Sequence, residues 1–334
     1  MYTFIIAIVI LVVGYFIYGT YIARIVDVNP QNTTPALTRT DGIDFVPLPT
    51  WKVFMIQFLN IAGLGPIFGA IMGAQFGTAS YLWIVFGTIF GGAVSGSHAT
   101  QSPLMARCLK NEKHAKPVFY GAMIAEGIVA LIWAAAATAF YQDNGTDFTQ
   151  GQVVNFICHN WMGVFGGVLA ILGVVFAPIT TGDTVLRAAR LIVADTFHIE
   201  QKSIRNRMLI CIPIFAVCAA FLVFSLGDTK NFAIVWRYFT WSNQVMAAFT
   251  FWAITVYLTQ RGKNYFVSLI PAIFMSFVTI SFILEAPTGA YIPGKGLTPW
   301  IAQTIAAVVT ITLVAWFCRW MKIRKTGENF GDKA

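Results

Sequence analysis

Apolar residues form long runs along this chain, and short polar stretches separate them. A helix that crosses the ~30 Å hydrocarbon core of a membrane needs about 20 apolar residues. Runs of this length predict an all-α polytopic membrane protein. The pattern predicts nine spans, near residues 2–23, 51–75, 79–105, 118–141, 152–178, 207–227, 233–258, 265–284 and 299–320.

The basic residues predict how these spans are oriented. Of the 22 Lys and Arg residues, all but Lys230, Arg237 and Lys295 lie in or beside alternate loops. Positive loops favour the cytoplasmic side, so we expect a cytoplasmic C-terminus and, with nine spans, an external N-terminus. The first run has neither a basic segment before it nor a small-residue cleavage site, which predicts a retained span.

Composition excludes several classes of protein. Hydrophobic residues make up 57% of the chain and charged residues only 11%, whereas a soluble domain carries about 25% charged residues. A soluble enzyme, a disordered chain and a fibrous repeat are therefore excluded. The net charge of +8 is spread over the short loops, so membrane lipids are expected as neighbours and nucleic acid is not.

We expect one transmembrane domain over residues 1–334, with an N-terminal helical part (1–94) and a C-terminal helical part (95–334). Residues 187–206 differ from the other loops because charged residues alternate there with Leu, Ile and Phe. This pattern predicts an amphipathic cytoplasmic segment or the solvated end of a span.

The five cysteines lie in or beside the spans, are odd in number and form no CxxC pair. They are interpreted as packing residues, so neither a disulfide framework nor a metal site is predicted.

The second run contains the first group of polar residues at membrane depth. Gln57 and Asn60 share one helical face. Gly63, Gly65 and Pro66 follow, and Pro66 has no N–H to donate to the preceding turn. The segment predicts a broken helix whose free carbonyls bind a substrate or cation. An ordinary packing kink with small residues is the alternative.

A second group, Ser95 to Pro103, has no large apolar side chain although apolar stretches flank it. Such a run predicts a water-filled or substrate-lined site. His98 is a candidate proton or substrate contact, and Gln101 and Ser102 are candidate substrate contacts. For His98, a structural hydrogen bond is the alternative.

A third group offers hard oxygen ligands beside an expected helix break at Pro178. Thr180, Thr181 and Asp183 suit a small cation, although the same residues fit the N-cap of the following helix. Glu126, inside the fourth run, is a candidate proton carrier, because an unpaired carboxylate is costly at that depth. Its alternative is an interhelical hydrogen bond.

Signatures of enzymes are missing from the sequence. It contains no Walker loop, no Gly-x-Ser-x-Gly elbow and no HExxH motif. We therefore predict a non-enzyme with no catalytic residues and no cofactor.

Several motifs resemble a known family. They are GPIFGAI (65–71), SGSHATQSPLMARC (95–108), YGAMIAEG (120–127), ITTGDT (179–184) with RAARLIVAD (187–195), and WRYFTWSNQ (236–244). Together these segments resemble the carbon starvation protein A (CstA) family from about residue 51 onward.

That resemblance implies a bacterial inner-membrane transporter of the inverted-repeat type, for small peptides or, in close relatives, for pyruvate with protons. It also implies a shortened chain, because several more spans normally separate the segments that meet here at Val94 and Ser95. The sequence thus predicts a secondary transporter driven by protons or another cation. A membrane sensor or structural module without transport is the first alternative. An intramembrane enzyme that uses His98 with Asp183 or Glu126 is the second.

Overall fold

In a computed structural model, the chain is described over residues 2–40, 42, 45–91, 96–201, 203–286 and 296–325. This described part is helical and contains no β-strand. Its one isolated bridge joins Leu48 to Leu109. The all-α fold expected from the apolar runs is therefore confirmed.

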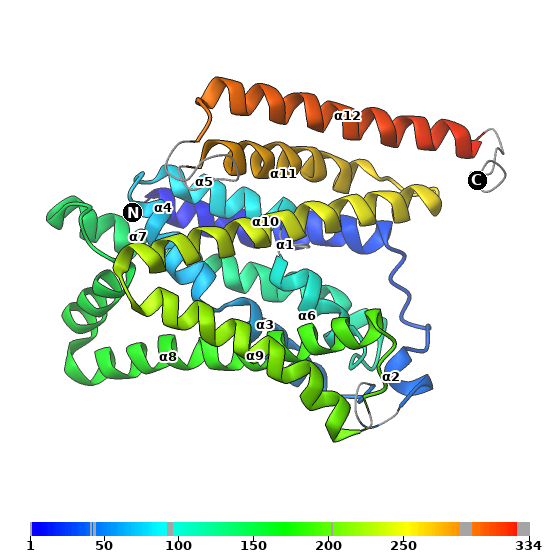
Figure 1. The fold of residues 1–334 in the computed structure, drawn as a ribbon, viewed down its shortest axis with the longest axis horizontal. Coiled ribbons are helices and arrows are strands. Elements are labelled where there is room, and N and C mark those ends of the chain that lie inside the picture. The colour runs from blue at the N-terminus through cyan, green and yellow to red at the C-terminus, as the bar shows by residue number, and fades with distance from the viewer. Residues whose placement is uncertain are drawn as a thin grey trace. The chain divides into compact units, whose positions relative to one another are not determined.

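Helices follow one another with short connections (Figure 1). In chain order they are α1 (Tyr2–Ile25), α2 (Pro35–Thr38), α3 (Thr50–Ile61), η1 (Gly65–Gly69), α4 (Ala70–Ala74), α5 (Ala79–Phe86), η2 (Gly87–Gly91), α6 (Gly96–Ala106), η3 (Glu112–His114), η4 (Lys116–Tyr120), α7 (Gly121–Asn144), α8 (Gln150–Thr196), α9 (Ile204–Leu226), α10 (Thr229–Gln260), α11 (Phe266–Glu285) and α12 (Pro299–Lys325).

Within the described residues, six helices are long and apolar enough to cross a membrane, or seven if α3 and its bent continuation count as one span. The predicted number of nine is therefore too high. In place of the span expected at 79–105, the structure has the shorter apolar helix Ala79–Gly91 and the separate helix α6. Helix α10 is long enough, but it contains no membrane-length stretch that is apolar enough to be counted among the six.

The chain divides into two compact units, one of residues 1–93 and 97–217 and the other of residues 94–96 and 218–334. This division does not test the predicted parts 1–94 and 95–334 or the predicted amphipathic segment 187–206. They stay predictions. The last turns of α8 cover residues 187–196.

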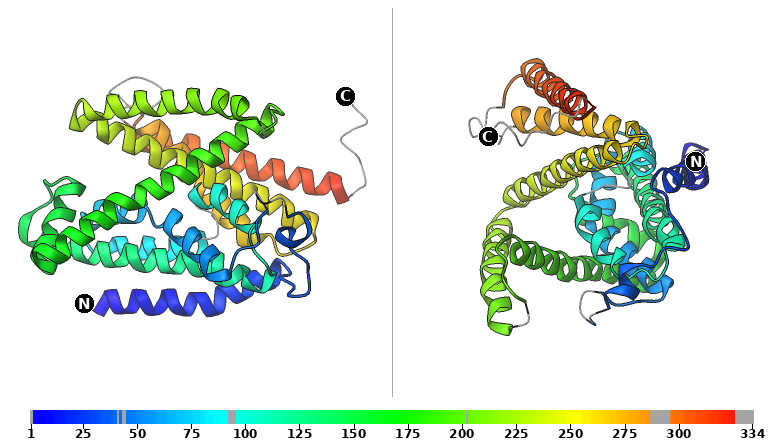
Figure 2. Two further views of the ribbon diagram at one scale, coloured as in Figure 1. Left: turned by 90° about the horizontal axis from the view of Figure 1, so that it is seen from below. Right: turned by 90° about the vertical axis from the view of Figure 1, so that its right-hand side faces the viewer.

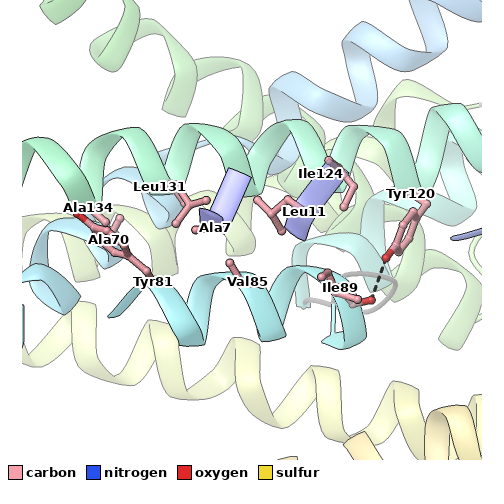
Figure 3. Packing of buried hydrophobic residues seen from close by; sticks show 11 residues of the cluster. Ala7, Leu11, Ala70, Tyr81, Val85, Ile89, Tyr120, Ile124, Leu131 and Ala134 are labelled. Carbon is pink, nitrogen blue, oxygen red and sulfur yellow. Dashed lines mark hydrogen bonds between the residues drawn. The ribbon is translucent and has the colours of Figure 1, made fainter. Parts of the chain in front are cut away.

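The core of the first unit forms where α1, α5 and α7 meet (Figure 3). Leu11 and Leu131 are fully buried there, and the Tyr120 hydroxyl donates to the Ile89 carbonyl at 3.1 Å. Figure 2 shows α1, in blue, running alongside α7. Glycine permits α7 to pack closely against η2, since a Cβ on Gly127 would lie 2.6 Å from Thr88 Oγ1.

In the second unit, α11 packs against both α10 and α12 (Figures 1 and 2). Two indole groups of α10 bind α11. Trp241 Nε1 donates to the Thr279 carbonyl and Trp252 Nε1 donates to Ser276 Oγ, both at 3.0 Å. Thr255 Oγ1 of α10 also donates to Ser268 Oγ of α11, at 2.8 Å, so polar side chains join these two helices at several points.

Candidate functional site at the broken second span

The second span is broken where the sequence predicts it. Helix α3 ends at Ile61, and a π-helical turn, η1, begins at Gly65 with Pro66 in its first turn. The two halves are bent by 48°. Pro66 provides no N–H for the preceding turn, and glycines on its N-terminal side permit the departure from helical geometry. The prediction of a broken helix is confirmed.

Buried polar side chains lie on the last two turns of α3, just before the break. Gln57 is fully buried and Asn60 is 7% exposed. Gln57 Nε2 donates to Ser102 Oγ of α6 at 3.1 Å. Gln57 Oε1 is buried and has no hydrogen-bond partner within the described part of the chain. A buried acceptor in this condition carries a desolvation penalty of about 1–3 kcal/mol.

Helix α6 contributes a second amide to the same place. Met105 and Val53 belong to one buried apolar cluster, and Gln101 stands one turn before Met105 while Gln57 stands one turn after Val53. Gln101 is 4% exposed, and its Nε2 has no partner among the described residues. An unsatisfied donor on α6 and an unsatisfied acceptor on α3 are therefore both buried near the Gln57–Ser102 hydrogen bond.

Thr181 of α8 also contacts the break. Its hydroxyl donates to the Asn60 carbonyl at 3.4 Å. A Cβ on Gly63 would lie 3.2 Å from Thr181 Oγ1, so a larger residue there requires Thr181 to shift by a few tenths of an ångström. We call Gln57, Asn60, Gln101, Ser102 and Thr181 the break cluster.

Glu126 lies on the side of α7 that faces the break. One turn before it, Ala122 packs with Ile61 at the end of α3, and one turn after it, Ala130 lines a cavity beside Gly65 and Pro66. The Glu126 Oε2 atom is buried without a hydrogen-bond partner in the described structure. A carboxylate in this position is stable only if it is neutral or finds a cation.

The cavity next to the break has a volume of about 340 Å³ and is built mainly from small residues. The glycines at 65, 69 and 73 lie one turn apart, and a Cβ on Gly65 or Gly69 would meet nothing within 4 Å. Space for a small molecule therefore exists beside η1.

Asp183 does not join Thr181 at the break. Its side chain is 73% exposed and pairs with Arg187 at 3.4 Å, because a two-residue step on a helix turns a side chain to the opposite face. The expected helix break at Pro178 and the N-cap interpretation are both wrong, since α8 is helical throughout this stretch. Its non-helical residue is Gly163, with φ 65°.

Some predicted residues cannot be placed in this site. Predictions on the side chains of His98 and Thr180 and on Ser95 fall outside the described residues. The predicted substrate contacts do not include Gln57, although its hydrogen bond to Ser102 joins α3 to α6. Its position one turn before Asn60, on the same face of an apolar run, was the available signal.

Metal chemistry finds no support in the described part of the chain, where no three His, Cys, Asp or Glu residues gather. None of the five cysteines, which all lie in that part, forms a disulfide, and Cys108 and Cys158 are buried. Polar groups of the break cluster are thus amides, hydroxyls and backbone carbonyls, with one carboxylate nearby.

Fold and site together define a multi-pass α-helical membrane protein with a discontinuous helix at a buried polar site. The model of the family "Carbon starvation protein CstA" matches residues 1–100 and 146–282. This match covers more than half of the chain, so the protein belongs to the CstA family.

Several bacterial proteins are similar to parts of the chain. A Haemophilus influenzae "Uncharacterized membrane protein" is 50% identical over 28% of this chain and 25% of its own length. The Campylobacter jejuni "Peptide transporter CstA" is 40% identical over 28% of this chain and 14% of its own length. The Escherichia coli "Pyruvate/proton symporter BtsT" is 37% identical over 25% of this chain and 12% of its own length.

The matched region thus spans a quarter or less of the length of these three relatives. A short H. influenzae "Uncharacterized protein" is 42% identical over 36% of this chain and 82% of its own length. No solved structure is significantly similar to the chain.

Proposed function

We propose that this protein is a secondary transporter for small peptides or a small carboxylate such as pyruvate, driven by protons or another cation. The observation that carries the proposal is the open hydrogen-bonding capacity beside a broken membrane helix. Gln57 Oε1 and Gln101 Nε2 are buried there without partners among the described residues. Discontinuous helices form the substrate sites of many secondary transporters.

Both substrate classes complement these groups. A substrate carboxylate accepts a hydrogen bond from the Gln101 amide. A peptide amine or N–H donates to Gln57 Oε1 or to the carbonyl that Pro66 leaves without a helical donor. In this proposal Asn60, Gly63, Gly65, Pro66, Gln101 and Ser102 contact substrate, and His98 remains a further substrate or proton contact.

Glu126 is the proposed proton carrier. Its buried Oε2 has no partner in the described structure, so binding and releasing a proton changes a charge directly beside the break. A cation site at Thr180, Thr181 and Asp183 is the second route. It has weaker support, because Asp183 points away from Thr181.

Names of relatives support transport rather than catalysis. Peptide transporters and a pyruvate/proton symporter each match part of this chain.

We further propose that the protein lies in the bacterial inner membrane with its C-terminus in the cytoplasm, as the distribution of basic residues predicts. The alternative function is a sensor or structural module.

Ligand-dependent thermal stability tests this function before any transport assay. A ligand present at 100 times its Kd adds about 2.7 kcal/mol to the free energy of unfolding. We expect pyruvate or an alanyl dipeptide to raise the melting temperature of the purified chain. Glycerol, which carries no charge, should not raise it. A melting temperature that neither pyruvate nor any tested dipeptide changes would favour the structural module.

A further inference from the structure

A long apolar groove runs between α10, α11 and α12, in the second unit of the chain. Its volume is about 700 Å³. The α10 residues that line it recur on one face of the helix, from Trp241 to Gln260. At 1.5 Å per residue this stretch is about 28 Å long, which is close to the ~30 Å thickness of a bilayer core.

Aromatic rings line this groove and are held in place. Hydrogen bonds from their indole N–H groups to α11 fix Trp241 and Trp252. Phe317 is buried and packs edge-on against Trp252 and Tyr265 and stacked on Trp320. Because these rings are anchored, the groove is preformed.

The two ends of the groove differ in charge. Contact of Phe317 with Tyr265 brings the C-terminal turns of α12 to the α10–α11 turn. Exposed cations gather at this end, which carries no acidic residue in the described part of the chain. They are Arg261, Arg319, Lys322 and Arg324. Asp228 and Glu285, the acidic residues of the unit that the structure describes, lie at the opposite ends of α10 and α11.

We propose that this groove is a binding site for an anionic phospholipid. One acyl chain lies along the Trp-lined groove, and the phosphate contacts the cations at the α10–α11 turn and the end of α12. Charge complementarity identifies the occupant, because basic residues at the membrane surface attract anionic headgroups by about 1 kcal/mol each. This site is separate from the break cluster and does not depend on the proposed transport.

The choice of an anionic lipid follows from both parts of the site. A zwitterionic lipid brings its own cation to the basic end and gains less. A free phosphate lacks the apolar chain that fills the groove. Arg261 and Arg324 already stack on Tyr257 and Trp320, so their charges are held beside the mouth of the groove.

Lipid retention by the full chain tests the proposal. The protein is purified in detergent, incubated with equal amounts of phosphatidylglycerol and phosphatidylcholine, and its bound lipid is measured by native mass spectrometry. We expect preferential retention of phosphatidylglycerol and a higher melting temperature with it. Glycerol 3-phosphate, which carries the charge without the chain, should have neither effect.

Two variants test the contacts with the lipid headgroup and with the acyl chain separately. The triple variant Arg261→Gln, Lys322→Gln, Arg324→Gln should bind phosphatidylglycerol about fivefold more weakly for each cation removed. Arg39→Gln, Lys52→Gln, Lys110→Gln removes the same charge from exposed positions of the first unit and should retain binding. Val245→Trp, which fills the groove, should lower retention of any lipid.

Each contrary outcome has a clear meaning. Equal retention of both phospholipids, or equal loss in the two triple variants, would overturn the proposal. So would stabilisation by glycerol 3-phosphate alone, which would indicate an anion site without a lipid chain. A dimer that Val245→Trp dissociates, without retained lipid, would assign the groove to a second copy of the chain. The comparisons use variants whose monodispersity and melting temperature match those of the unaltered chain.

Discussion

At the scale of single residues, a substitution of Gln101 should affect the stability of the fold and the rate of uptake differently. Its buried Nε2 has no partner in the described structure, so Gln101→Leu removes a desolvation penalty of about 1–3 kcal/mol while it removes a substrate donor. We expect an unchanged or higher melting temperature together with at least about tenfold lower uptake.

The matched control is Gln303→Leu, at an exposed position of α12. It should change neither the melting temperature nor uptake. Wild-type uptake by Gln101→Leu, with the protein folded, would remove this amide from the substrate site.

Gly63 and Thr181 provide a second test at the residue scale. A Cβ at position 63 would lie 3.2 Å from Thr181 Oγ1, so Gly63→Ala should displace Thr181 and lower both stability, by about 1 kcal/mol, and uptake. Thr181→Ala removes the opposing hydroxyl. The double variant should therefore melt closer to the wild type than the sum of the single changes predicts. Additive losses would show that the two residues do not contact each other.

Which side chains meet at the break could be predicted only in part. Gln57, Asn60 and Pro66 are close in sequence, and helical periodicity places Gln57 and Asn60 on one face of α3. The approach of Thr181 to Asn60 joins residues that are 121 positions apart, and local pattern carries no information about such contacts. Asp183 was grouped with Thr181 by proximity along the chain, but the helix directs the two side chains to opposite faces.

At the scale of elements, the bend between α3 and η1 depends on Pro66. Pro66→Ala restores a backbone N–H and should straighten the span, with the melting temperature rising and uptake falling. Circular dichroism melts and uptake measured on the same preparation check both effects. Unaltered uptake kinetics in a protein that melts at a higher temperature would mean that the bend is not part of the site.

Breaks inside a membrane-length run were predictable where glycine and proline coincide, and not where either stands without the other. Gly63, Gly65 and Pro66 act together, and the helix breaks there. Pro178 stands without a neighbouring glycine, and α8 continues through it. A membrane helix tolerates a proline where neighbouring groups satisfy the freed carbonyl. The interruption at Gly163 was not predicted, because no proline accompanies the glycine there.

At the scale of the whole molecule, apolar length predicts the fold class better than the number of spans. The runs at 118–141, 207–227, 265–284 and 299–320 all correspond to membrane-length helices. The run at 79–105 is described as the shorter apolar helix Ala79–Gly91 and as α6, and residues 92–95 between them lie outside the described part of the chain. The two compact units follow from contacts between helices, which periodicity does not specify.

We propose that the break cluster of this membrane protein serves gradient-driven transport. Uptake into proteoliposomes tests it most directly, with labelled pyruvate and a labelled dipeptide compared under an imposed proton gradient and after its collapse. We predict that one of the two accumulates only while the gradient is present. If monodisperse, folded protein accumulates neither substrate under the gradient, the account of this chain as a transporter is contradicted.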